Sequence, residues 1–251
     1  MTELGVVHLV RRANGIEALE RFLDSYRLHP AGAEHELVLV FKGFDGERDS
    51  EPYREIAADS CKRWVSVPDE GFDLGAYWRA AQELPHRRLL FLNSFSVILA
   101  ENWLALLLAA ARDPRMGAVA ASGSWGSQAS HLRYSLGLGG PYGGVWGDRA
   151  STQRVFAELA GASGEGQPHA GAIGRRFDRA SAIARQATGF AAFPSAHLRT
   201  NGLLIERDAW LRVCPRAPGD KLGAHRMESG RRGITARLRA SGLEVAVVGR
   251  D

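Results

Sequence analysis

The stretch RRLLFLNSFSVILAENWL, residues 87–104, contains the pattern that decides the fold. Its four consecutive apolar residues, 89–92, are bounded by polar ones, which is typical of a central strand buried on both faces of a sheet. The chain leaves this expected strand through Asn93, Ser94, Phe95 and Ser96. In an open α/β sheet, ligands bind just beyond the carboxyl ends of the strands. Residues 93–96 are therefore expected to face a ligand.

Strand-like and helix-like segments alternate on both sides of this stretch. Short apolar runs predict strands, and apolar residues at helical spacing predict the helices between them. The expected strands are residues 5–10, 35–41, 63–67, 88–92 and 117–121, and the expected helices are residues 14–27, 51–60, 73–84 and 102–111. This alternation indicates an α/β fold with a doubly wound, mainly parallel central sheet and helices on both faces.

The alternation stops after residue 122, where glycine becomes frequent. Residues 123–147 combine glycines with four aromatic side chains, which could stack on sugar rings, cover the core or contact a second subunit. Residues 161–174 are close to low complexity and are expected to form a mobile loop. The other elements expected in this half are helices at residues 151–159, 176–187, 207–213 and 228–240, and strands at 198–205 and 243–248.

Composition and charge limit the classes of function. The chain has 251 residues with a formal net charge of +4, and its basic residues lie in scattered pairs without the aromatic interleaving of a single-strand nucleic-acid binder. No nucleic acid is therefore expected, whereas an anionic small ligand or a peripheral contact with an anionic membrane stays open. The start shows no secretory signal, and no run of about 18 apolar residues occurs, so a cytoplasmic protein is expected. Cys61 and Cys214 are expected to be buried thiols, with a disulfide or a metal site as the alternatives.

Four segments of the sequence resemble segments of the GT-A glycosyltransferases of the inverting family-two type, and they occur in the same order. DEGFDLGAYWRAA (residues 69–81) is similar to the glycine-rich stretch that precedes the metal strand of that family. FLNSFSVILAENWL (91–104) resembles the metal-binding strand and the start of the helix that follows it. NGLLIERDAW (201–210) resembles a later strand and helix. MESGRRGITARLRASGLEVAVVG (227–249) is similar to the segment that carries the catalytic acidic residue. The resemblance implies one GT-A-like domain over residues 1–251, with a nucleotide-sugar-binding half (1–122) and an acceptor and catalytic half with mobile loops (123–251).

The chain departs from the family at its metal motif. The family has Asp-x-Asp, whose carboxylates hold Mg²⁺ or Mn²⁺ against a nucleoside diphosphate, and the corresponding residues here are Asn93, Ser94 and Phe95. An amide and a phenyl ring cannot supply the carboxylate oxygens that hard divalent cations prefer. The resemblance implies a divalent cation, but these residues predict that none is tightly held, and no other cofactor is expected.

The resemblance also implies the catalytic machinery. Glu228 corresponds to the base that takes the proton of the acceptor hydroxyl. From the residues alone, it is equally a glutamate favoured by the positive end of the helix expected at 228–240. Arg231 and Arg232 would neutralise the leaving diphosphate as guanidinium groups do, or are solvated helix charges. Asp220 is the nearest alternative base.

The substrate-binding residues that the resemblance implies lie mostly after the expected strands. Asp69 and Asp73 follow the third strand, where the family binds base and ribose, and Arg11 and Asn14 follow the first, beside the nucleobase. The alternatives are helix caps for Asn14 and Asp73 and ordinary loop charge for the others. The set is completed by Asn93, Ser94, Ser96 and Asn201.

Two hypotheses of function follow. In the first, the chain is a glycosyltransferase that moves a sugar from a nucleoside-diphosphate sugar to an acceptor hydroxyl with inversion, without a metal. In the second, it is a non-catalytic nucleotide-sugar-binding or assembly subunit of the same fold that has lost the acidic motif. The acceptor (glycan, lipid, protein or small molecule) and a homodimer stay open. Retention of Glu228 favours the enzyme, because a binding subunit needs no carboxylate there.

Overall fold

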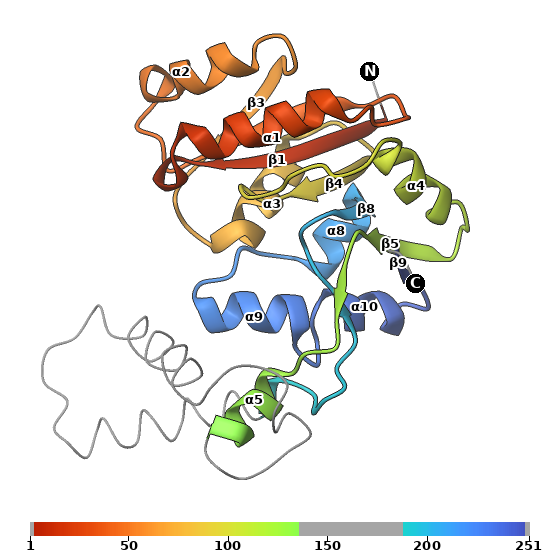
Figure 1. Cartoon of the computed structure of the whole chain (residues 1–251). Helices are drawn as coiled ribbons and strands as arrows, with labels where there is room; N and C mark the ends of the chain where they lie inside the picture. The colour runs from red at the N-terminus through yellow and green to blue at the C-terminus, as the bar shows by residue number, and fades with distance from the viewer. Residues whose placement is uncertain (1–2, 136–187, 249–251) are drawn as a thin grey trace, which may run out of the picture.

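The computed structural model describes residues 3–135 and 188–248, and its centre is a seven-stranded sheet (Figure 1). The order across the sheet is β3 (Arg63–Val67), β2 (Glu36–Lys42), β1 (Leu4–Arg11), β4 (Arg88–Leu92), β8 (Leu203–Glu206), β5 (Met116–Ala120) and β9 (Glu244–Val247). Neighbouring strands are parallel except for β8, which runs antiparallel to both β4 and β5. Two short strands, β6 (Gly123–Ser124) and β7 (His197–Leu198), pair separately. The predicted mainly parallel sheet is confirmed.

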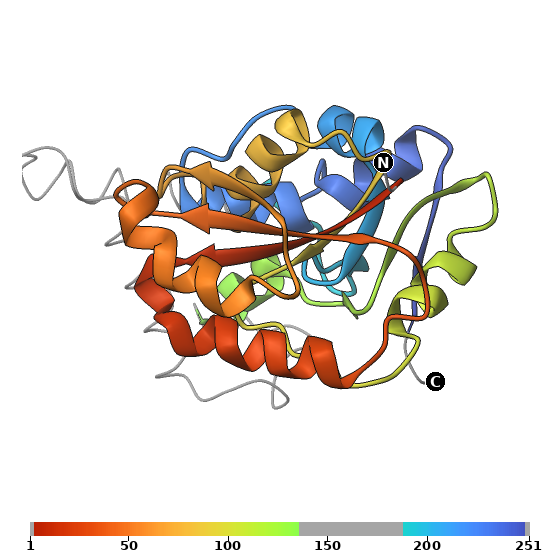
Figure 2. The ribbon, with the colours of Figure 1, turned by 90° about the horizontal axis from the view of Figure 1, so that it is seen from above.

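Helices cover both faces of this sheet, as Figure 2 shows. One face packs against α1 (Ile16–Leu28), α2 (Glu47–Ala57) and α4 (Trp103–Ala110), and the other against α3 (Phe72–Glu83), α8 (Arg207–Val213) and α10 (Ile234–Ala240). Two more helices in the described ranges are α9 (Lys221–Ser229), next to α3 and α10, and α5 (Gln128–Ser135). None of the helices in the described ranges is long and apolar enough to cross a membrane.

Alternation along the central strands divides the core into two layers. In β1, Val6 and Val10 pack with α1, whereas Val7 and Leu9 pack with α3. In β4, Phe91 lies between Tyr77 and Trp210, with ring centroids 4.6 Å from each. Burying both faces of a strand in this way explains why residues 89–92 form an unbroken apolar run.

Several sequence predictions are confirmed with small shifts of their ends. Strands 63–67 and 88–92 and helix 207–213 have the predicted limits, and the remaining predicted elements of the first 122 residues differ at their ends by a few residues. Cys61 and Cys214 are buried free thiols, as predicted. The helices predicted at 151–159 and 176–187, the mobile loop at 161–174 and most of the aromatic segment 123–147 lie outside the described residues.

Two predicted elements of the second half are wrong because glycines interrupt them. The strand predicted at 198–205 is divided into β7 and β8 by a turn at Asn201 and Gly202, where Gly202 has a φ of 74°. The helix predicted at 228–240 is two helices, α9 and α10, with Gly230 and Gly233 in extended conformations between them.

Both predicted side-chain caps are also wrong. The residue before α1 is Gly15 rather than Asn14, and the residue before α3 is Gly71 rather than Asp73; neither helix has a side-chain cap hydrogen bond. Asn14 belongs to the short 3₁₀ turn η1 (Arg12–Asn14), and Asp73 lies in the first turn of α3. Glycine at these two positions supplies the positive φ, 75° at Gly15 and 69° at Gly71, by which the chain enters each helix.

His8 makes the stability of this fold depend on pH. Its ring lies in β1, 1% exposed, stacked 3.6 Å from the ring of Phe22, and burial lowers its pKa from 6.5 to about 3. The unfolded chain therefore binds a proton between these two pH values that the folded chain does not, so stability falls as pH falls through this window.

We expect the His8→Phe variant to lose part of this acid sensitivity. Phenylalanine keeps a ring against Phe22 but does not titrate, so the variant should lack a slope of up to about 1.4 kcal/mol per pH unit. Urea unfolding at pH 7, 6, 5 and 4 measures the slope for both proteins. Equal slopes would contradict the assignment to His8.

Candidate active site

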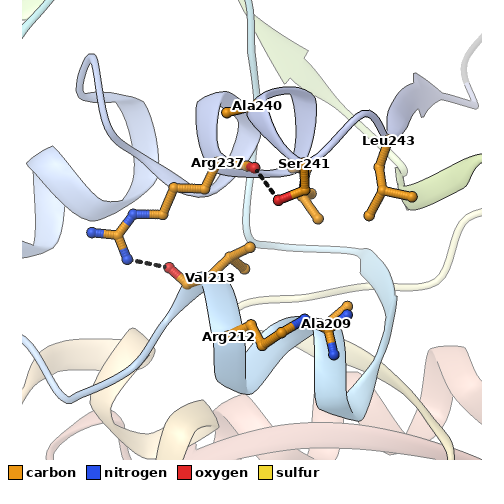
Figure 3. A pocket seen from close by; sticks show the side chains of 8 residues that line it. Ala209, Arg212, Val213, Arg237, Ala240, Ser241 and Leu243 are labelled. Carbon is orange, nitrogen blue, oxygen red and sulfur yellow. Dashed lines mark hydrogen bonds between the residues drawn. The ribbon is translucent and has the colours of Figure 1, made fainter.

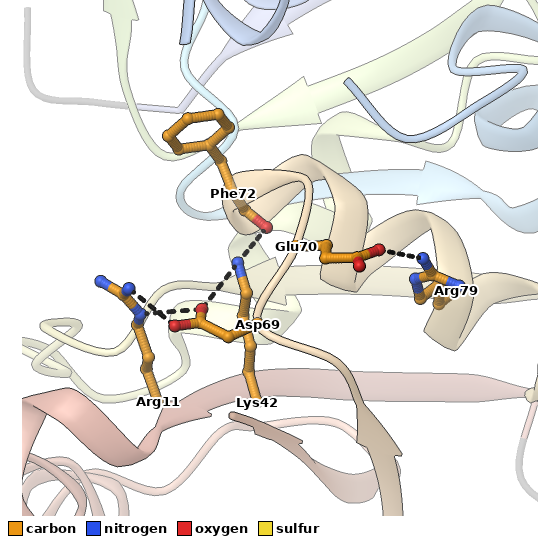
Figure 4. A network of polar contacts seen from close by, with 6 residues as sticks. All are labelled: Arg11, Lys42, Asp69, Glu70, Phe72 and Arg79. Carbon is orange, nitrogen blue, oxygen red and sulfur yellow. Dashed lines mark hydrogen bonds and ion pairs between the residues drawn. The ribbon is translucent and has the colours of Figure 1, made fainter. Parts of the chain in front are cut away.

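The carboxyl ends of β1, β2 and β3 bring three charged side chains together. Arg11, the last residue of β1, donates from Nε and Nη2 to the Asp69 carboxylate, over 3.2 and 3.0 Å. Lys42, the last residue of β2, places Nζ 3.6 Å from Asp69 Oδ1 and donates to the Phe72 carbonyl over 2.8 Å (Figure 4). Arg11 and Asp69 were predicted site residues that this network brings together; Lys42, a weaker candidate from its place after the second strand, was outside the predicted set.

Burial and pairing act in opposite directions in this network. The hydrogen bond from Arg11 lowers the pKa of Asp69 and raises that of Arg11. Burial lowers the pKa of Lys42, although the charges of Asp69 and Asp73 oppose the shift. Burial raises the pKa of Asp73, and the charge of Glu228 adds to that rise. Asp73 therefore protonates more readily than Asp69.

A second polar network lies at the carboxyl end of β4. The Asn201 amide oxygen accepts from the Asn93 N–H over 2.9 Å and from the Ser96 hydroxyl over 2.7 Å. The Asn93 amide oxygen in turn accepts from the Phe95 N–H over 3.0 Å. Three predicted site residues, Asn93, Ser96 and Asn201, therefore form one network.

Glu228 joins this network through Thr200, the residue before Asn201. Its Oε1 accepts from the Thr200 N–H and hydroxyl, over 3.1 Å each, and its Oε2 lies 3.7 Å from Arg199 Nη1. The Glu228 side chain is only 16% exposed. The sequence missed Thr200 and Arg199, because nothing in their residue types distinguishes them from loop residues.

The predicted helix position of Glu228 is wrong. Glu228 is the second-last residue of α9 instead of the start of a helix, so the positive end of a helix does not stabilise its charge. Hydrogen bonds from Thr200 and the nearby Arg199 hold its carboxylate in place instead. Asp220, the alternative base, is the N-cap of α9 and accepts from the Gly223 N–H.

Other predicted residues lie apart from Glu228. Arg231 follows α9, where its Nε donates to the Phe190 carbonyl over 3.0 Å. Arg232 is exposed, and its carbonyl accepts from Arg237. Within the described ranges, Arg199 is the guanidinium that reaches ion-pair distance of Glu228. Asn14 and Ser94 line a narrow cleft with His8 and Arg11.

A larger pocket lies between α8 and α10 and contains none of the predicted site residues. Its volume is about 430 Å³, and its lining is mostly apolar, with Arg212, Arg237 and Ser241 (Figure 3). Arg237 Nη1 donates to the Val213 carbonyl over 2.8 Å, which ties α10 to the end of α8. None of the carboxylates near the strand ends lines this pocket.

The residues at the end of β4 do not fit a divalent cation. An Asp-x-Asp pair would present carboxylate oxygens, whereas this chain presents an amide at Asn93 and a phenyl ring, 68% exposed, at Phe95. In the described part of the chain, no three His, Cys, Asp or Glu side chains gather so that they could hold a metal ion.

The fold has counterparts among solved structures. The mannosyltransferase PcManGT from Pyrobaculum calidifontis, in complex with GDP-Man and Mn²⁺, superposes with a TM-score of 0.50 at 12% identity, over 98% of this chain and 54% of that one. This chain thus spans about half the length of the mannosyltransferase. S. aureus TarS (1–349) matches 47% of this chain and 35% of its own at 12% identity, with a TM-score of 0.37 that carries no structural argument.

Sequence comparisons add no assignment. No protein-family model matches the chain, and no curated protein matches it. The likeness to PcManGT therefore concerns the fold, and the predicted α/β architecture with a mainly parallel central sheet is confirmed.

Restoring the acidic motif should create a metal requirement. In the Asn93→Asp, Phe95→Asp double variant, two carboxylates replace the amide and the phenyl ring, so Mn²⁺ should raise the melting temperature in the presence of GDP or UDP. The wild-type protein should show no such gain when Mn²⁺ is added and no loss with a chelator. A chelator-sensitive wild type would contradict the interpretation of residues 93–95.

Proposed function

We propose that this chain is a glycosyltransferase that moves a sugar from a nucleoside-diphosphate sugar to an acceptor hydroxyl with inversion at the anomeric carbon. The observation that carries the proposal is the carboxylate of Glu228, held by Thr200 and linked through Asn201 to the exit of β4. These hydrogen bonds and the low exposure of the side chain fix the carboxylate in one position, as a general base requires. The GT-A-like fold supports the same class of reaction.

The donor would lie across the carboxyl ends of β1 to β4, in the half formed by residues 1–122. Arg11, Lys42 and Asp69 lie at one part of this edge of the sheet, and Asn93 and Ser96 at the other. A backbone N–H group can only donate, so the side-chain atom that it meets must be the amide oxygen. Asn93 N–H thus meets the oxygen of the Asn201 amide, and Phe95 N–H meets the oxygen of the Asn93 amide. Both amides then have their NH₂ groups left as donors, which suit phosphate oxygens.

Glu228 would act as the general base, in the half formed by residues 123–251. The acceptor oxygen bonds to the anomeric carbon on the face opposite the diphosphate, and its proton passes to the Glu228 carboxylate. The bond from the anomeric carbon to the phosphate oxygen breaks, and its electron pair leaves with the nucleoside diphosphate. Inversion follows, because attack and departure are on opposite faces.

Cationic side chains would offset the charge of the leaving diphosphate in place of a metal. Arg199 is near Glu228, and Arg11 and Lys42 lie at the strand ends. Arg231 donates to the Phe190 carbonyl. Arg231 and Arg232 would therefore contact the diphosphate only after a movement of their loop toward the donor.

The Glu228→Gln variant tests the mechanism. Glutamine keeps an oxygen for the Thr200 hydrogen bonds but cannot take a proton, so transfer should fall by roughly 10²–10⁴-fold. Donor binding, measured by calorimetry with a panel of nucleoside-diphosphate sugars, should change less than about threefold. Transfer is measured by product formation with the donor that binds best and a panel of hydroxyl acceptors.

Glu244→Gln is the matched control. Glu244 lies on β9 and pairs with Arg115 over 2.9 Å, away from the crevice residues, so this change should leave transfer unaffected. Undiminished transfer by Glu228→Gln would show that the base lies elsewhere. A wild-type protein that binds a nucleotide sugar but transfers to no acceptor would favour the non-catalytic hypothesis.

A further inference from the structure

Phe72 has a backbone conformation that phenylalanine rarely adopts. Its φ is 55°, in the left-handed region, and in the described residues only one other non-glycine residue, Asn102, has a positive φ. Asparagine tolerates this region, but for a bulky side chain it is strained. Such strain persists only where surrounding structure enforces it, and it is concentrated at functional sites.

The structure around Phe72 enforces this conformation from two sides. Gly71, just before it, is also left-handed with a φ of 69°, and a Cβ there would come within 3.0 Å of the Gly75 backbone. Lys42, whose side chain is 3% exposed, donates from Nζ to the Phe72 carbonyl over 2.8 Å. A largely buried ammonium group thus holds the carbonyl group of Phe72 in place.

The ring that this backbone presents is not a core ring. Phe72 is 42% exposed, whereas Phe22, Phe41 and Phe91 are completely buried. In Figure 4 the ring points away from the network of Arg11, Lys42 and Asp69. Among the described aromatic contacts none involves Phe72. Packing of the core therefore does not account for the strain.

We propose that Phe72 is a ring-stacking residue for the donor. The inference rests on the proposed function, because it takes the diphosphate of the donor to lie beside Arg11 and Lys42 and one end of the donor to extend past the start of α3 to the Phe72 ring. A nucleotide-sugar diphosphate attracted by Arg11 and Lys42 joins a nucleoside, which carries a flat base, to a sugar, whose C–H groups form an apolar face. The base and the sugar each present a face that packs on a phenyl ring. The charged side chains nearby offer no such apolar surface.

The test compares variants of Phe72 that separate its ring from its strain. Phe72→Tyr keeps both, Phe72→Leu keeps the strain without the ring, and Phe72→Gly removes both. Asn102→Gly is the matched control, because it relaxes a left-handed residue at the start of α4, outside the crevice. Each protein is titrated by calorimetry with UDP, GDP, UDP-glucose and GDP-mannose, and its melting temperature is measured without ligand.

The expected result is opposite effects on binding and stability. Phe72→Gly and Phe72→Leu should weaken binding by about 5- to 100-fold, the range for loss of one stacked ring, whereas Phe72→Tyr and Asn102→Gly should bind within about twofold of wild type. Phe72→Gly should melt at the wild-type temperature or above, since glycine relieves the strain. Losses equal for nucleotides and nucleotide sugars identify the base as the stacked ring; losses confined to nucleotide sugars identify the sugar.

Two results would overturn the inference while leaving the proposed function intact. One is undiminished donor binding by Phe72→Gly and Phe72→Leu. The other is a fall in the melting temperature of Phe72→Gly that parallels its loss of binding, which would make Phe72 a structural residue. If wild-type protein binds none of the four compounds, the proposed function fails, and the stacking role fails with it.

Discussion

The insertion of β8 between β4 and β5, antiparallel to both, is the constraint on which the candidate site depends. Because β8 runs against β4, the turn before β8 lies at the carboxyl end of β4. Backbone hydrogen bonds fix that turn between the two strands: Gly202 N–H donates to the Phe91 carbonyl, and Ala121 N–H donates to the Gly202 carbonyl. Thr200 and Asn201 are thereby held beside Asn93, and Glu228 is positioned by Thr200. A carboxylate more than a hundred residues after β4 in the chain reaches the end of that strand by this route.

A second chain of dependence runs from Asp69 through Lys42 to Phe72. The ion pair of Arg11 with Asp69 is more than 40% exposed on both sides, so it contributes at most about 1 kcal/mol to stability. Lys42 is different, because its side chain is almost completely buried and an unpaired buried ammonium is costly. Asp69 and the Phe72 carbonyl together compensate that burial. The conformation at the start of α3 is therefore coupled to the charge at the end of β2.

The sequence was sufficient for the parallel half of the fold and insufficient for the arrangement of the second half. Apolar runs such as 37–41 and 89–92 are strong local signals, so their strands could be predicted. The antiparallel direction of β8 has no local signal, because it is determined by pairing with β4 and β5. Glu228 was assigned to the wrong end of a helix because its own residue type suits a helix start, whereas Gly230 and Gly233 decide where α9 and α10 separate. Lys42 was left out of the predicted set because a lysine after an apolar run is usually solvated; only the structure shows it turned inward.

The amides at the end of β4 change the kind of ligand that this strand can contact directly. A carboxylate offers only acceptors, so a strand end with two of them meets a diphosphate through a bridging cation. Here the Asn201 oxygen already accepts two hydrogen bonds, from Asn93 N–H and the Ser96 hydroxyl, and the Asn93 oxygen accepts from Phe95 N–H. What these amides still offer is N–H, a donor that repels a cation and attracts a phosphate oxygen. Under the proposed function, the same place in the fold would contact the diphosphate without an intermediary, and Arg11, Lys42 and Arg199 would supply the positive charge that a metal would bring. The absence of paired carboxylates at β4 is then compatible with a carboxylate at Glu228, because the two groups would serve different steps.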